Sequence, residues 1–247
     1  MQIDLKSSFT RPCGAIIESR LRRSAISECL ADGNNLPTKH NFDFYVKCDI
    51  SKIIFGLIGI ALIASSSAVI NQILDVEIDG KMERTRNRPL VKGEITQSNA
   101  KIFSGVLLVA GILLLYFFNN ILTIFLTLLT WAFYSFFYTK VLKFAGTQNI
   151  VIGGIAGAMP PLLGWTAVTN SVDPLPLLMV LIIFIWTPPH FWALSINRKE
   201  DYLAAKIPMM PVIKGIEYTK IQIALYSVLL ATISLFPFAT GYLGGFY

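Results

Sequence analysis

Long apolar runs alternate with short polar segments along most of this chain. The runs are rich in Leu, Ile, Phe and Gly, and each is close to the length that a helix needs to cross a bilayer. Backbone groups in lipid must be hydrogen-bonded within the protein, so we expect each run to form a membrane-spanning helix. The six runs cover residues 52–70, 102–118, 121–138, 150–168, 175–194 and 221–243. The pattern therefore predicts an all-α, polytopic membrane helix bundle with six spans.

Small residues and prolines mark two of these spans as irregular. Residues 153–157 read GGIAG, a composition that permits close approach of neighbouring helices. Pro160 and Pro161 follow, and Pro188 and Pro189 lie in the next span. Proline removes a backbone donor, and broken helices at membrane depth are tolerated where they line a cavity or are buried in protein. We therefore expect two broken helices around a central chamber.

Composition excludes an ordinary soluble protein. Hydrophobic residues make up 54% of the 247 residues and charged residues only 15%, and the mean hydropathy is +0.59. The net charge of +6 does not indicate a nucleic-acid partner, because the basic residues follow the loops and form no patch with interleaved aromatic residues. The three cysteines, Cys13, Cys29 and Cys48, lack the spacing of a zinc site, so we assign them no chemistry.

The charges of the loops predict the orientation of the spans. Six Lys or Arg lie in residues 79–101, two in 139–149 and five in 195–220, whereas 119–120 and 170–174 contain none. Basic residues accumulate in cytoplasmic loops, so we expect the first three of these segments to face the cytoplasm. This orientation leaves whatever precedes the first span on the outer side of the membrane.

Residues 1–51 form a polar, basic tail that differs from residues 52–247, the predicted transmembrane domain. The tail shows no secretory signal, and its basic charge conflicts with the outer location. Two explanations are open: a span is missing ahead of residue 52, or a shifted frame or misplaced start has replaced the original segment. Residues 14–30 are compatible with an amphipathic helix on the membrane surface, and equally with a disordered tail.

A dense group of charges, the first acidic segment (residues 71–93), follows the first apolar run. Asn71, Asp75 and Asp79 are spaced four residues apart, so a helix would carry them on one face. Oxygen ligands beside a cluster of cations indicate Mg²⁺ together with a phosphate ester. An ordinary solvated loop remains the alternative. The cations of the cluster are Lys81, Arg84, Arg86, Arg88 and Lys92.

A smaller version of this pattern, the second acidic segment (residues 195–215), follows the fifth run. Asn197 and Asp201 repeat the four-residue spacing, and Arg198 and Lys199 lie between them. A charged turn next to the membrane would look similar. Both segments fall on the side of the membrane that the loop charges predict to be cytoplasmic.

Five sequence blocks resemble one known family. They closely resemble the protoheme IX farnesyltransferases (heme O synthases), a branch of the UbiA-type intramembrane prenyltransferases. The similarity covers about residues 52–243, keeps the family's order and leaves out the tail. The blocks are NxxxDxxxD with RTRNRPL at 71–90, YTKVLK at 138–143, QNIVIGGIAGAMPPLLGW at 148–165, TPPHFWAL at 187–194 and DYLAAKIPMMPV at 201–212.

The resemblance implies a fold and a set of site residues. The family fold is a bundle of nine helices around a chamber, so the first and the last two helices would be lacking here. The implied catalytic residues are Asn71, Asp75, Asp79, Tyr138 and Asp201. The implied Mg²⁺ ligands are Asn71, Asp75, Asp79, Asn197 and Asp201. Arg84, Arg88, Lys140, Lys143 and Lys199 are the candidates for binding diphosphate, although basic residues at a membrane face also serve topology or contact lipid headgroups.

The resemblance also implies the reaction, in which farnesyl diphosphate and heme B are the substrates. A farnesyl cation needs a dry pocket lined by aromatic rings, which Trp131, Tyr134, Phe137 and Tyr138 are suited to form. A heme vinyl group then attacks the cation and water completes the product, heme O. His190 is a candidate for binding heme; a buried histidine hydrogen-bonded to a carbonyl freed by a proline is the alternative.

Three other functions are compatible with parts of the sequence. A prenyltransferase acting on a quinone precursor would share the diphosphate site, and a transporter would also place polar residues at broken helices. A truncated, inactive remnant of the farnesyltransferase would retain every motif. The resemblance favours the bacterial inner membrane, an active site facing the cytoplasm, and heme-pathway or oxidase-assembly proteins as partners.

Overall fold

The structure is a computed structural model that describes residues 50–242. Ile50–Leu235 forms one compact unit, and α15 (Phe236–Ala239) belongs to another. α15 is a single turn, in which the Thr240 N–H donates to the Phe236 carbonyl at 2.8 Å. The interpretations of residues 1–51 as a tail or a surface helix lie outside the described residues, except for the last two positions.

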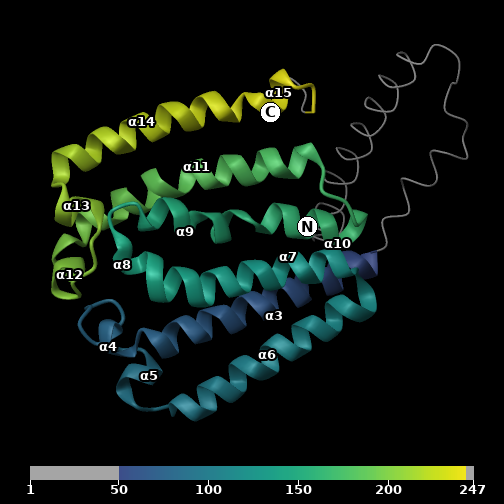
Figure 1. Cartoon of the computed structure of the whole chain (residues 1–247), viewed down its shortest axis with the longest axis horizontal. Helices are drawn as coiled ribbons and strands as arrows, with labels where there is room; N and C mark the ends of the chain where they lie inside the picture. Colours follow the sequence, from purple (N-terminus) through teal and green to yellow (C-terminus); the bar gives the residue numbers. More distant parts are fainter. Residues whose placement is uncertain (1–49, 243–247) are drawn as a thin grey trace, which may run out of the picture. The chain divides into compact units, whose positions relative to one another are not determined.

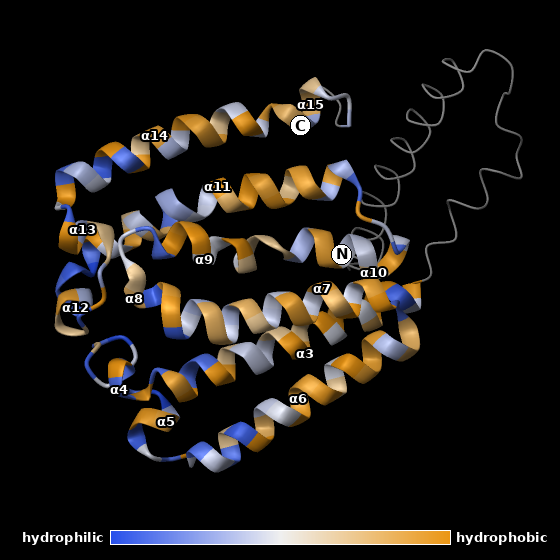
Figure 2. Cartoon of the chain, viewed as in Figure 1, coloured by the Kyte–Doolittle hydropathy of each residue, from blue (hydrophilic) through white to orange (hydrophobic). Residues whose placement is uncertain are grey.

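The described residues contain six helical segments that are long and apolar enough to span a membrane, as predicted. The hydropathy colouring in Figure 2 follows these segments. Three spans are single helices: Ile50–Leu74 (α3), Gln97–Phe118 (α6) and Pro174–Asn197 (α11). The span Ile121–Ala145 consists of α7 (Ile121–Ala132), η1 (Phe133–Leu142) and α8 (Lys143–Ala145), and the span Asn149–Thr169 consists of α9 (Asn149–Ala158) and α10 (Pro160–Thr169). The span Ile216–Ala239 consists of α14 (Ile216–Ser234) and α15.

The outer faces of these helices carry exposed apolar side chains. Phe117, Ile121 and Val228 are among the most exposed of them. Such a surface is compatible with a hydrocarbon environment and not with water. The chain is therefore an integral membrane protein, in agreement with its composition.

Glycines explain the close packing of α3 against α6. A Cβ atom on Gly111 would lie 2.8 Å from the carbonyl oxygen of Gly59 and 2.6 Å from the Cγ1 atom of Ile63. The same pair of helices is joined by a buried hydrogen bond of 2.9 Å between the Ser66 and Ser104 hydroxyl groups. Small residues and hydroxyl groups are the usual means of helix association in lipid.

The two proline pairs have different effects. As predicted, the first pair coincides with a break, because α9 ends at Ala158 and α10 begins at Pro160. The prediction of a second broken helix is wrong, since α11 continues through Pro188 and Pro189. Isolated losses of a backbone donor are tolerated when the remaining hydrogen bonds and neighbouring helices hold the segment.

A π-helix, η1, lies in the middle of the third span and was not predicted. Its wider turn brings residues five apart together, and the Thr139 hydroxyl donates to the Tyr134 carbonyl at 2.9 Å. π-Helical turns occur frequently at functional sites. The apolar pattern does not distinguish a π-helical turn from an α-helix, because each has one buried face and the helix continues through it.

The short helices lie together at one end of the long ones. Because consecutive spans run in opposite directions, every second connection returns to the same end. Figure 1 shows this end of the unit, and Figure 2 shows that hydrophilic loops gather there between short apolar stretches. The helices there are α4 (Val76–Asp79), α5 (Pro89–Lys92), α8, α12 (Lys199–Ala204) and α13 (Met210–Ile213). Both acidic segments thus meet at this polar end.

Candidate active site

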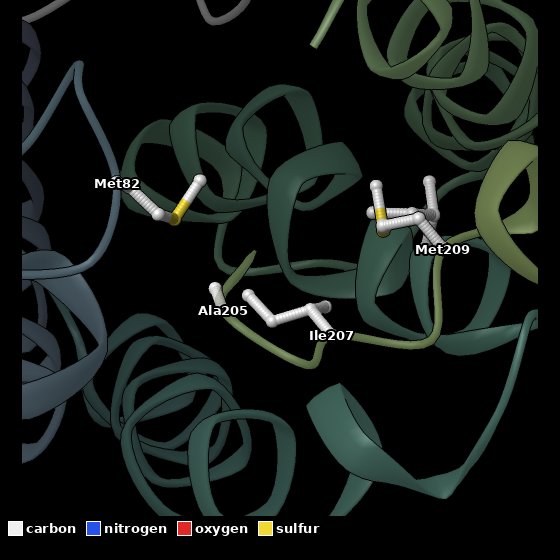
Figure 3. Packing of buried hydrophobic residues seen from close by; sticks show 5 residues of the cluster. Met82, Ala205, Ile207 and Met209 are labelled. Carbon is white, nitrogen blue, oxygen red and sulfur yellow. The ribbon is translucent and has the colours of Figure 1, made fainter. Parts of the chain in front are cut away.

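An apolar cluster, which we call the loop core, holds the two acidic segments together. Its members are almost fully buried and come from three places: the loop after α4, the start of α9, and the chain between α12 and α13 (Figure 3). The cluster consists of Met82, Ile150, Ala205, Ile207 and Met209. Burying these side chains stabilises a polar loop region that would otherwise lack apolar contacts.

A direct hydrogen bond joins the segments beside the loop core. The backbone N–H of Glu83, which follows Met82, donates to Oδ1 of Asp201 at 3.4 Å. The first and second acidic segments are therefore neighbours in space although Glu83 and Asp201 are separated by 118 positions in sequence. The loop charges predicted that the two segments share one side of the membrane; the structure adds that they are in contact.

Asn71 and Asp75 lie side by side, as their spacing predicts. The Asn71 amide donates to Oδ2 of Asp75 at 2.9 Å and to the Thr139 hydroxyl at 3.3 Å. α3 ends at Leu74, but the N–H groups of Asp75 and Asp79 still bond four residues back. Asp75 itself departs from helical geometry (φ −97°, ψ 6°), so the predicted helical face joins Asn71 and Asp75 and is interrupted before Asp79.

Asp75 is buried and paired with a cation from another span. Only 4% of Asp75 is exposed, and the Lys143 Nζ atom lies 2.7 Å from its Oδ2 atom. Lys143 is the first residue of α8, directly after the π-helix. A buried carboxylate without such a partner would be strongly unfavourable, so this ion pair offsets the cost of burying Asp75.

Asp79 is equally buried and is paired with Arg88. The Arg88 Nη1 atom lies 2.5 Å from Oδ2 of Asp79, which is 4% exposed. The intervening loop turns back because the Thr85 hydroxyl donates to the Asp79 carbonyl at 2.9 Å. Arg88 has extended backbone, and Pro89 then begins α5. The loop thus returns a guanidinium group to the carboxylate that precedes it.

The remaining predicted cations differ from Arg88 and Lys143. Arg84 and Lys140 are exposed and Lys199 is half-buried. The Lys140 amino group lies over the Phe136 ring, 5.7 Å from its centroid. Five cations were predicted to bind diphosphate. Within the described part of the chain, two of them, Arg88 and Lys143, form ion pairs with carboxylates.

The second acidic segment is more open than the first. Asn197 is exposed and Asp201 is half-buried. α11 ends at Asn197, and Arg198 departs from helical geometry before α12 begins (φ −121°, ψ 26°). The expectation that Asn197 and Asp201 repeat the helical spacing is therefore wrong, because the helix is interrupted between them.

Two of the four predicted aromatic residues face each other beside Asp75. The Tyr134 and Tyr138 rings are stacked, with centroids 5.6 Å apart. Tyr138 packs directly on Gly153, where a Cβ atom would lie only 2.4 Å from its ring. Trp131 instead donates to the Ser66 hydroxyl at 3.3 Å, and Phe137 is exposed.

Close approach at the small residues of α9 is therefore confirmed in part. Gly153 accommodates the Tyr138 ring, and Gly154 lies against Thr187 of α11, whose Cγ2 atom would be 3.0 Å from an added Cβ. Gly157 has open space where a side chain would be. Gly153 thus sets the approach to Tyr138 and Gly154 the approach to α11, whereas Gly157 contributes to neither.

Tyr202 belongs to the same region and was not predicted. It packs against the loop core. Burial raises the pKa of its phenol, the nearby Arg84 and Arg198 oppose the shift, and Asp201 adds to it. The phenol therefore stays protonated at neutral pH and can donate a hydrogen bond. An aromatic residue directly after an acidic one was the available signal in the sequence.

His190 is exposed and stacks on an aromatic neighbour. Its ring lies 4.3 Å from that of Trp186 at an angle of 18°, and Phe191 approaches it edge-on at 5.4 Å. The alternative of a buried histidine bonded to a freed carbonyl is wrong, because His190 is exposed.

The oxygen ligands fit a metal ion that is shared with a ligand. Within residues 50–242, no group of three or more His, Cys, Asp or Glu side chains could hold a metal by itself. Mg²⁺ commonly uses one or two carboxylates and completes its shell with water and phosphate oxygens. Asp75 and Asp79 are two such carboxylates, at the polar end of the bundle.

Several curated proteins are similar to this chain. Protoheme IX farnesyltransferase 2 of Pseudoalteromonas atlantica is 55% identical over 195 residues, which are 79% of this chain and 64% of that protein. Protoheme IX farnesyltransferase 1 of Shewanella sp. strain ANA-3 is 48% identical over 239 residues, which are 97% of this chain and 75% of that protein. The chain thus spans slightly less than two thirds of the first relative.

A solved structure shares the fold. It is a UbiA homolog from Archaeoglobus fulgidus bound to GPP and Mg²⁺, with a TM-score of 0.65 and 18% identity, covering 79% of this chain and 69% of that one. At this identity the comparison supports the helical architecture alone.

The similarity extends further toward the amino terminus than the motifs indicated. The Shewanella match covers nearly the whole chain and so includes most of residues 1–51, which corrects the expectation that the tail takes no part. The model of the UbiA prenyltransferase family matches residues 43–247. With most of its length matched and a helical bundle of the same architecture, the chain belongs to the UbiA prenyltransferase family.

Proposed function

We propose that this chain transfers a farnesyl group from farnesyl diphosphate to a vinyl group of heme B, giving heme O and diphosphate. The observation that carries the proposal is the pair of buried carboxylates, each beside a cation, at the polar end of the bundle. The names of relatives about 50% identical to this chain supply the farnesyl donor and the heme acceptor.

The carboxylates are suited to hold Mg²⁺ on the leaving diphosphate. Asn71, Asp75 and Asp79 would provide one set of ligands, and Asn197 and Asp201 the other. A homolog of the same fold, from Archaeoglobus, is bound to GPP and Mg²⁺, which makes Mg²⁺ the metal to propose; the choice of ligands rests on the sequence motifs. When bound, the metal neutralises charge that develops on the leaving group.

The basic residues around the carboxylates would hold the diphosphate itself. Arg88 and Lys143 already lie at Asp79 and Asp75, the carboxylates that would hold the metal ion on the diphosphate. Arg84, Lys140 and Lys199 would contribute from more exposed positions. Fixed cations around a leaving group lower the barrier to its departure.

The tyrosine pair is suited to the carbon centre that forms when the allylic C–O bond breaks. The electron pair of that bond leaves with diphosphate, and the Tyr134 and Tyr138 rings stabilise the farnesyl cation through their faces. A vinyl carbon of heme then forms the new C–C bond. Water adds to the resulting heme-side cation and loses a proton, which gives the hydroxyethylfarnesyl group.

Heme would approach from the apolar part of the bundle. His190, stacked on Trp186, presents an imidazole in that part and is the candidate for orienting heme. A central chamber between the helices would enclose the reacting groups. Heme-pathway or oxidase-assembly proteins would deliver heme or receive the product.

The polar end would face the cytoplasm of a bacterium, in the inner membrane. The basic loops on that side support this orientation, and the similar proteins come from bacteria. Prenyl diphosphates have a charged headgroup and an apolar chain, so a site at the membrane–water interface suits them.

The test is turnover in membranes that contain this chain. Heme B, farnesyl diphosphate and Mg²⁺ are added, and heme O is detected by its mass. Formation of heme O that is lost in Asp75→Asn supports the proposal. Prenylation of a quinone precursor in place of heme would overturn it, and absence of any product would favour the inactive remnant.

A further inference from the structure

Both buried carboxylates of the first acidic segment are held by cations from elsewhere in the chain. Lys143 contacts Asp75 at 2.7 Å and is itself only 14% exposed at its side chain. Arg88 contacts Asp79 at 2.5 Å and is 28% exposed. These cations neutralise the same carboxylate groups that the proposed reaction requires as metal ligands.

A metal ion and these cations compete for the carboxylates. If Mg²⁺ bound alone, it would displace Lys143 and Arg88 and leave four positive charges close together in a partly dry site. If diphosphate bound alone, it would attract both cations and leave two buried carboxylates without a partner, which is costly. When both bind, every charge has a partner.

We propose that Lys143 and Arg88 are exchangeable counter-ions: they neutralise Asp75 and Asp79 until Mg²⁺ and a prenyl diphosphate bind together, and then transfer to the diphosphate. This inference rests on the proposed function and adds to it that the metal ion and the diphosphate bind together. The two ligands must raise each other's affinity by the same factor, because coupling between binding sites is reciprocal. Neither free Mg²⁺ nor free diphosphate then occupies the site efficiently.

The chain offers a matched pair of lysines for the test. Lys143 contacts Asp75, whereas Lys140, one turn earlier, has its amino group over the Phe136 ring. Lys143→Met and Lys140→Met therefore remove the same charge from neighbouring positions. Only the first removes a competitor for the carboxylate.

The measurement is the affinity of the purified chain for Mn²⁺ alone. Electron paramagnetic resonance detects the bound and free ion. We expect Lys143→Met to bind Mn²⁺ roughly tenfold more tightly than the unmodified chain, because the positive charge that competes with the metal for Asp75 is removed. Lys140→Met should leave this affinity within about twofold, and Lys143→Arg should restore the weak binding. The thermal shift from adding Mg²⁺ and inorganic diphosphate together should exceed the sum of the separate shifts, and this excess should shrink in Lys143→Met.

Tighter metal binding on removal of a positive charge is an outcome that a purely structural role of Lys143 does not produce. If Lys143→Met does not fold, Arg88→Met tests the same exchange at Asp79 with the same expected sign. Unchanged or weaker Mn²⁺ binding in the folded variant, or equal tightening in Lys140→Met, would overturn the exchange. If instead Asp75→Asn leaves Mn²⁺ affinity unchanged, the metal assignment of the proposed function is wrong.

Discussion

The two acidic segments have similar sequences and different environments. Asp75 and Asp79 of the first are buried. Asp75 is paired with Lys143 of α8, and Asp79 with Arg88 of the loop after α4. Asn197 of the second is exposed, and half-buried Asp201 accepts a hydrogen bond of 3.4 Å from Glu83. Burial concentrates electrostatic effects, because charges are screened less when water is excluded. We therefore expect the first segment to dominate the chemistry and the second to hold the ligand in place.

The largest effect should come from removing one charge in the first segment. Asp75→Asn or Asp79→Asn should lower heme O formation by about 10³-fold or more, since several kcal/mol of metal-based stabilisation is lost. Membrane insertion should be unchanged. Asp201→Asn should cost only about 10- to 100-fold, because half-buried Asp201 is better screened by water and so binds the metal more weakly. Equal losses for Asp75→Asn and Asp201→Asn would remove the distinction between the segments.

Chelation tests the same comparison without mutation. EDTA should stop turnover, and added Mg²⁺ should restore it, because residues 50–242 contain no group of three His, Cys, Asp or Glu side chains that would retain the ion without diphosphate. Heme O formation is again the measurement. Activity that resists EDTA would argue against Mg²⁺ at Asp75 and Asp79.

The loop core should determine how the second segment contributes. Met82 is 4% exposed, so Met82→Ala should lower the free energy of unfolding by about 2 kcal/mol. It should also raise the KM for farnesyl diphosphate more than it lowers kcat, because the two segments lose their common anchor. Met179→Ala is the control, since Met179 is 44% exposed. A variant with normal stability and KM would show that the segments are positioned independently.

The smallest effect should come from an exposed ion pair in the first segment. Arg86 and Glu83 lie 3.8 Å apart on the surface, and such pairs contribute about 0–1 kcal/mol. Arg86→Ala should therefore change turnover by less than about threefold. Arg88→Ala, two residues away, should be far more damaging, because it leaves Asp79 buried without its cation. Turnover assays on the two variants check this contrast.

Patterns within one segment were the most predictable features. The apolar runs predicted all six spans, and the four-residue spacing predicted the contact of Asn71 with Asp75. Both depend on the regular geometry of a helix, in which neighbours in sequence become neighbours in space. The break before Pro160 was predictable from proline, which removes a backbone donor and so also acts locally.

Features that depend on the surroundings were missed or misjudged. Proline chemistry alone predicted a broken helix at Pro188, but the neighbouring contacts keep α11 continuous. The spacing of Asn197 and Asp201 suggested one helical face, but α11 ends at Asn197 and the chain turns at Arg198. In each case local preference was smaller than the energy of packing or solvation at that place.

The amino-acid sequence by itself determined that this chain is a helical membrane protein with two acidic segments at one end. Hydrophobic length and helical periodicity suffice for that, because both act over short stretches of chain. Only the tertiary structure decided that Lys143, and not Lys140, contacts Asp75, and that the loop core joins the acidic segments. Charge pairing at buried sites depends on distances of a few ångströms between distant parts of the chain, and those distances are set by helix packing.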